Sequence, residues 1–88
     1  MSREISAEVW RARFPNTHHS VRDHRDGRSE IGIGLFGDYA QSVLIRLLSH
    51  GGDVIEEGIY DGHGLNKAEA LIRAQKWAES KLGPLIDQ

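Results

Sequence analysis

Hydrophobic residues in the middle of this chain fall into two short runs that predict a β-hairpin. The runs, 42–49 and 53–60, are rich in leucine and β-branched residues and flank the turn His50-Gly51-Gly52-Asp53, whose glycines tolerate positive φ. We therefore expect two antiparallel strands of similar length. An alternative is a helix over residues 38–50, begun by a capping box of Asp38 and Gln41 and ended by Gly51.

A helical period of hydrophobic residues follows, and it predicts an amphipathic helix over residues 67–82. Asn66 is the expected N-cap, and Gly83 followed by Pro84 is expected to end the helix. The expected buried stripe consists of Ala68, Leu71, Ile72, Gln75, Ala78 and Leu82. Trp77 lies off the centre of this stripe, so we expect it to pack at a sheet edge; the alternative is an exposed anchor for a partner.

The N-terminal third predicts a short helix and two further strands. Ser6 is the expected cap of a helix over 6–14, with Ile5 before the cap as a hydrophobic staple and Pro15 at its end. Strands are expected over about 17–25 and 29–36, joined by a type I′ turn at Asp26-Gly27. On the second of these strands, Gly32 and Gly34 alternate with a hydrophobic face, and paired glycines either weaken a strand or let another element come close.

Together these elements predict an α+β fold in a single small domain spanning residues 1–88. Its two layers are an antiparallel sheet of three to four strands and the C-terminal amphipathic helix packed on one face, preceded by the short N-terminal helix. The chain has only 88 residues, so its core is near the lower limit for independent stability. We expect a monomer or a homodimer.

Composition adds a cellular setting and a charge asymmetry. The chain has no cysteine and no apolar run long enough to span a bilayer, so we expect a cytoplasmic protein with no membrane partner. Its net charge is −2, yet residues 1–28 carry six arginines against four acids, and residues 29–60 carry one arginine against five acids. This distribution predicts a basic end and an acidic sheet edge, unless both are ordinary solvated surfaces.

Catalytic, metal and phosphate chemistry have little support in the residue pattern. His18, His19 and His24 lie near Asp23 and Asp26, but their spacing matches no closed zinc site. On a strand His18 and His24 would share a face, so the alternative is a site with these two ligands. No nucleophile elbow or carboxylate pair frames the serine, histidine and aspartate residues. The glycine-rich segment 58–64 lacks the Gly-Lys-Ser/Thr ending of a phosphate-binding loop. We therefore expect no enzyme activity, no metal and no cofactor.

Residues 42–82 resemble the closing half of a double-stranded-RNA-binding domain, in which a hairpin leads through a glycine-containing loop into an alanine-rich helix. The segment reads Gly62-His63-Gly64-Leu65-Asn66-Lys67-Ala68-Glu69-Ala70, followed by Ala74 and Ala78. The resemblance implies a related scaffold. That family places several lysines at the helix N-terminus to contact phosphates, whereas here only Lys67 stands there, with Glu69 beside it. The RNA activity is therefore not expected at this helix.

The chain also resembles in type the small proteins of phages and mobile elements, including anti-CRISPR proteins, which are single α+β domains without cysteines or active sites. This resemblance implies inhibition by binding, in which acidic residues occupy an Arg/Lys-lined groove of a nucleic-acid-handling enzyme. The residues expected to bind such a partner are Asp53, Glu56, Glu57, Asp61 and Trp77. A plainer interpretation is that Glu56 and Glu57 only keep an edge strand soluble.

These observations favour a non-catalytic module that binds another protein. The alternative is a nucleic-acid-binding protein on the double-stranded-RNA-binding-like scaffold, using arginines of the N-terminal third: Arg11, Arg13, Arg22, Arg25 and Arg28. Against this alternative, no aromatic residue stands among the last three of these arginines to stack on bases.

Overall fold

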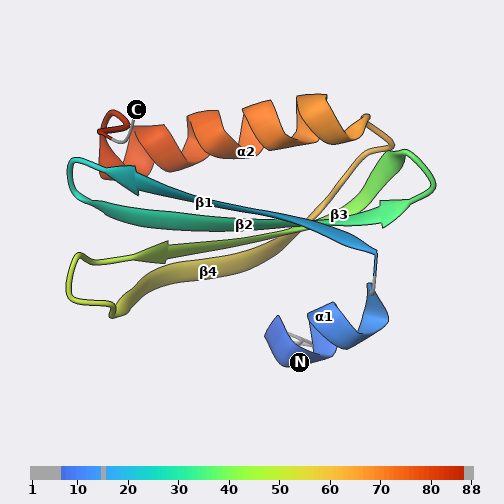
Figure 1. Ribbon diagram of the computed structural model, residues 1–88, viewed down its shortest axis with the longest axis horizontal. Helices are drawn as coiled ribbons and strands as arrows, with labels where there is room; N and C mark the ends of the chain where they lie inside the picture. Colours follow the sequence, from blue (N-terminus) through green and yellow to red (C-terminus); the bar gives the residue numbers. More distant parts are fainter. Residues whose placement is uncertain (1–6, 15, 87–88) are drawn as a thin grey trace.

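The protein is an α+β domain in which a helix covers one face of a four-stranded antiparallel sheet (Figure 1). The computed structural model describes residues 7–14 and 16–86. In chain order its elements are α1 (Ala7–Arg13), β1 (Thr17–His24), β2 (Gly27–Phe36), β3 (Tyr39–Leu48), β4 (Val54–Asp61) and α2 (Lys67–Leu82). This arrangement confirms the expected fold class. The expected cap Ser6, staple Ile5 and stop Pro15 of the first helix lie outside the described residues.

The sheet is a simple meander in the order β1-β2-β3-β4, with every neighbouring pair antiparallel. Residues 39–48 form β3, so the strand interpretation of the central segment is confirmed and the helix alternative is wrong. β2 and β3 begin earlier than expected, at Gly27 and Tyr39. The first turn also differs, because His24 pairs with Gly27 and the loop is Arg25-Asp26, neither of which has positive φ. It is therefore not the type I′ turn expected at Asp26-Gly27.

The main core lies between α2 and the sheet. β2 and β3 contribute Ile31, Ile33, Val43, Ile45 and Leu47, and α2 contributes Ala70, Ala74, Ala78 and Leu82. The predicted stripe of α2 was partly wrong, since Ala68 is exposed and Ile72 is 52% exposed. The line that faces the sheet consists mainly of alanines four residues apart, whose short side chains let the helix backbone approach the strands closely.

Helix α2 begins and ends where the sequence predicted. The Asn66 side chain accepts a hydrogen bond from the Glu69 backbone N–H at 2.8 Å, and the Gly83 N–H bonds to the Glu79 carbonyl. Gly83 has a φ of 83°, a conformation that glycine adopts without steric cost. The local sequence thus defines both ends of this helix.

Helix α1 packs on the opposite face of the sheet, against Gly32 and Gly34 of β2 (Figure 1). Trp10 is fully buried there, and its indole Nε1 donates a hydrogen bond to Ser42 Oγ at 2.8 Å. Phe14 lies against Gly34, with its ring centroid 5.2 Å from that of Trp10. The expectation that Gly32 and Gly34 admit another element is confirmed.

A buried histidine connects the end of α2 to the sheet. His24 Nδ1 lies 3.0 Å from the Gly83 carbonyl oxygen, and its Nε2 lies 2.8 Å from Ser29 Oγ. A carbonyl can only accept, so Nδ1 carries the proton and, in the neutral ring, Nε2 accepts from the Ser29 hydroxyl. Backbone bonds from Ile86 N–H to Asp23 O and from Arg25 N–H to Pro84 O continue the contact. The C-terminal segment therefore covers the outer edge of β1 near His24.

Candidate binding edge and pocket

Strand β4 is an edge strand of the sheet. Within residues 7–14 and 16–86, no strand pairs with its outer side. The Gly62 N–H donates a hydrogen bond to the Gln41 carbonyl on β3. This bond shows which backbone groups of β4 point toward β3 and which point away from the sheet. Because these directions alternate along an antiparallel strand, the N–H and C=O groups of Glu57, Ile59 and Asp61 face outward. An edge of this kind can pair with an added strand.

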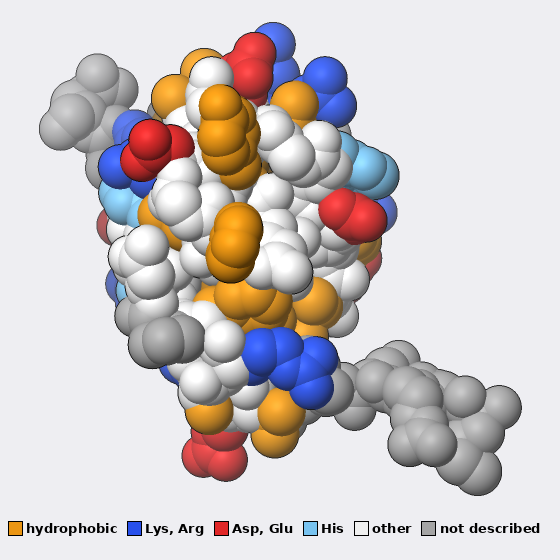
Figure 2. Space-filling model, turned by 90° about the vertical axis from the view of Figure 1, so that its right-hand side faces the viewer, with side chains coloured by type: hydrophobic (Ala, Val, Ile, Leu, Met, Phe, Trp, Pro, Cys, Tyr) orange, Lys and Arg blue, Asp and Glu red, His pale blue; other side chains and the backbone are white. Residues whose placement is uncertain are grey.

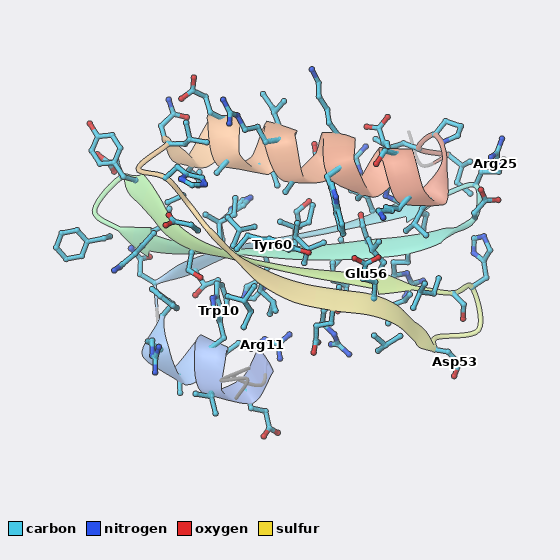
Figure 3. All side chains as sticks on the ribbon, turned by 180° about the vertical axis from the view of Figure 1, so that it is seen from behind. Trp10, Arg11, Arg25, Asp53, Glu56 and Tyr60 are labelled. Atoms are coloured by element: carbon cyan, nitrogen blue, oxygen red, sulfur yellow. The ribbon has the colours of Figure 1, made fainter. Side chains whose placement is uncertain are left out.

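The structure places all four predicted acidic residues on β4 or at its ends. Asp53 lies in the β3–β4 loop, Glu56 faces the α2 side together with Tyr60, and Glu57 and Asp61 face the α1 side (Figure 3). Side chains of alternate residues point to opposite faces, so a partner along this edge would meet carboxylates on both sides.

The four carboxylates differ in how far neighbouring cations neutralise them. Glu57 Oε2 lies 2.9 Å from Arg46 Nε, and the other end of the same guanidinium lies 3.3 Å from Glu30 Oε1. Glu56 has only a long contact, 4.0 Å, with Lys81 Nζ. Asp61 accepts a hydrogen bond from the His63 backbone N–H at 2.7 Å and stays largely exposed. The edge keeps a negative field, and Glu57 contributes least to it.

Helix α2 and β4 enclose a mostly apolar pocket of about 230 Å³. Its floor consists of Val43, Ile45, Leu65, Ala70 and Ala74, and its rim of Tyr60, Asp61, Gly62, His63, Arg73 and Trp77. The Tyr60 and Trp77 rings pack with centroids 5.8 Å apart, and Lys81 Nζ lies 5.4 Å from the Trp77 ring centroid. Trp77 thus packs against the edge strand, as the sequence predicted.

Sequence reasoning missed the pocket itself. Of its rim residues only Asp61 and Trp77 were predicted, and Tyr60, His63 and Arg73 were not. Two residues in the sequence could have indicated the pocket. Tyr60 is the last residue of the edge strand whose side chain faces α2, and Trp77 lies off the predicted stripe of the helix. Pairing these two aromatic residues requires the packing angle of α2 on the sheet, which the sequence pattern does not contain.

The arginines of the alternative prediction do not form one surface. Arg11 and Arg13 are exposed on α1, and Arg22 lies on β1. Arg25 lies in the β1–β2 loop, away from Arg11 (Figure 3), and Arg28 lies at the start of β2. Arg25 Nη2 lies 3.0 Å from Asp26 Oδ2, and Arg28 Nε lies 3.1 Å from Asp23 Oδ1. The hydrogen bond from Arg25 lowers the pKa of Asp26 below its ordinary value. The hairpin arginines are therefore paired with acids.

The histidines lie apart from one another. His18 and His24 share the α2 side of β1, and His19 lies on the other side. Both ring nitrogens of His24 are engaged in the contacts with Gly83 and Ser29. In the part of the chain that the structure describes, no group of three or more His, Asp or Glu residues could hold a metal ion.

The far end of the β2–β3 hairpin exposes two aromatic side chains. Phe36 is 78% exposed and Tyr39 is 60% exposed, on either side of the Gly37-Asp38 turn. Figure 2 shows this end of the molecule, where hydrophobic side chains lie between polar and charged ones rather than in one continuous patch. No helix within the described ranges is long and apolar enough to cross a membrane.

Comparisons with protein-family models, with curated proteins and with solved structures found no significant match. The geometry of β4, α2 and the pocket between them is therefore the basis for a function.

Proposed function

We propose that this protein is a non-catalytic module that binds another protein along the acidic edge of β4. One observation carries the proposal: the unpaired edge of the sheet also bears a cluster of acidic residues. The eight-residue strand β4 and the loop before it hold Asp53, Glu56, Glu57 and Asp61. Outward N–H and C=O groups supply affinity for an extended segment, and the carboxylates select a basic one.

The class of partner follows from the same charges. Enzymes that handle nucleic acids line their grooves with arginine and lysine, and a carboxylate-bearing edge can compete there with phosphates. Within this proposal the protein acts in the cytoplasm as an inhibitor of such an enzyme, in the manner of the phage and mobile-element proteins that it resembles in type. Inhibition requires only occupancy of the groove, so the module needs no catalytic residue of its own.

The first test is a pull-down from nuclease-treated lysate with matched charge variants. Asp53→Lys/Glu56→Lys reverses one exposed and one half-buried charge at the edge, and it spares Glu57, whose carboxylate pairs with Arg46. The control Glu8→Lys/Asp38→Lys changes the net charge equally at exposed positions on α1 and in the β2–β3 loop. We expect one stoichiometric protein partner that the native chain and the control retain and the edge variant loses.

Two outcomes would contradict the proposal. A partner that survives the edge reversal would place the interface elsewhere on the molecule. Capture that disappears after nuclease treatment, or nucleic acid alone in the untreated eluate, would instead favour binding through the arginines of α1 and the β1–β2 hairpin.

A further inference from the structure

Helix α2 leaves the α2-facing side of β4 largely uncovered. The helix packs on β2 and β3, and its main contact with β4 is the packing of Trp77 on Tyr60. The pocket described above lies in this gap, with Tyr60 and Asp61 on the strand side and Arg73 and Trp77 on the helix side. A group that approaches along the β4 edge would therefore reach the pocket directly.

The register of β4 predicts which side chains of an added strand would face the pocket. In an antiparallel added strand, partner residues bonded to the outward groups of Glu57, Ile59 and Asp61 would place their side chains on the α1 side, beside those same residues. The intervening partner residues, opposite Gly58 and Tyr60, would place theirs on the α2 side, where the pocket lies.

The charges on the two sides differ in a way that matches this alternation. On the α1 side, Glu57 and Asp61 would lie next to the partner's side chains and attract basic ones. On the α2 side the charges around the pocket are mixed, because Arg73 and Asp61 both lie at its rim and Lys81 lies beside Trp77 and near Glu56. An apolar side chain suits the apolar floor, whereas a lysine head group there would lose its water without a buried partner.

We propose that the pocket between α2 and β4 receives an apolar side chain from the partner, so that the partner is an extended segment in which basic residues alternate with apolar ones. This inference rests on the proposed function, because it requires a strand to pair with β4. The pocket volume of about 230 Å³ provides room for one large side chain such as leucine or phenylalanine.

The test uses a display library of random nonapeptides selected on the immobilised full-length protein. We expect enriched peptides in which Lys or Arg alternates with Leu, Ile, Phe or Trp. In a representative peptide, serine in place of the pocket-facing residue should weaken binding about tenfold or more, since one buried apolar side chain is worth ~1.4 kcal/mol or more. N-methylation of the backbone amides that face β4 should abolish binding.

Protein variants locate the binding site. Trp77→Ala and Tyr60→Ala should weaken binding of the representative peptide, whereas Ile72→Ala, on the exposed side of α2, should leave it unchanged. The thermal transition of each variant shows whether that variant is folded. Basic peptides that bind β4 with no preference at alternate positions, and that tolerate the serine change, would overturn the pocket inference and leave the proposed function standing. A library with no enriched basic peptide, or enriched peptides unaffected both by Asp61→Lys and by Asp53→Lys/Glu56→Lys, would overturn both.

Discussion

The indole of Trp10 lies so close to Gly32 that a methyl group on that glycine would be 3.1 Å from the ring. Just after the end of α1, Phe14 would lie 2.6 Å from a methyl group on Gly34. The absence of side chains at Gly32 and Gly34 therefore creates the space that Trp10 of α1 and the adjoining Phe14 fill. Contact with the sheet matters for α1, because a helix of seven residues is too short to be stable alone.

The first prediction concerns these glycines. Gly34→Ala should lower the free energy of unfolding by about 1–3 kcal/mol, because Phe14 must move out of its packed position. Gly51→Ala is the control, since Gly51 does not have positive φ and a methyl group there would meet only Ser49 Oγ, at 3.8 Å. Chemical denaturation measures both variants. Equal stability of the native chain and Gly34→Ala would show that α1 does not pack on β2 in this way.

The second prediction concerns the buried His24. His24→Phe should cost about 1–3 kcal/mol of unfolding free energy, because it fills the space but leaves the Ser29 hydroxyl and the Gly83 carbonyl without their partner. His19→Phe, on the other side of the same strand and exposed, is the matched control and should have little effect.

A double-mutant cycle separates the two contacts of His24. Ser29→Ala should lose most of its effect in the His24→Phe background, because the two side chains stabilise the fold through one shared hydrogen bond. Strictly additive losses for the two substitutions would contradict the contact.

The third prediction concerns pH. The hydrogen bond from Arg25 lowers the pKa of Asp26 in the folded protein, so folding favours the carboxylate form. The resulting stabilisation is present above the unfolded-state pKa of about 3.9 and is lost as the pH falls through the lower, folded-state pKa. In Arg25→Ala the Asp26 pKa should rise toward its ordinary value, as measured by the carboxyl carbon shift in an NMR titration. An unchanged Asp26 titration would refute the pairing.

The sequence alone determined the elements whose signals are local. Asn66, and Gly83 followed by Pro84, defined α2 to the residue, since caps depend on hydrogen bonds within one turn of the chain. The Gly51-Gly52 turn and the leucine-rich run before it defined the central hairpin, although the same run also fitted a helix. Only the pairing of β3 with both β2 and β4 decided that ambiguity, because strand hydrogen bonds join residues distant in the sequence.

The face that α2 buries was decided by tertiary packing. Hydrophobicity favoured Leu71 and Ile72, but the close approach of the helix to the sheet is possible only along the alanines at 70, 74 and 78. Alanine is weakly hydrophobic, so an amphipathicity argument undervalues it where small size matters most. The rotation of α2 in turn sets Trp77 against Tyr60 and leaves Ile72 half exposed.

Some features of the candidate site were likewise determined by the sequence, and others only by the tertiary structure. The sequence alone showed that acidic residues cluster between positions 53 and 61, since charge and strand period are properties of the local chain. Only the tertiary structure decided that this strand is an unpaired edge, that Arg46 lies beside Glu57, and that a pocket opens between β4 and α2. The edge and the Arg46–Glu57 contact depend on how the strands pair, and the pocket depends on where α2 packs on the sheet, so each feature is set by contacts between elements.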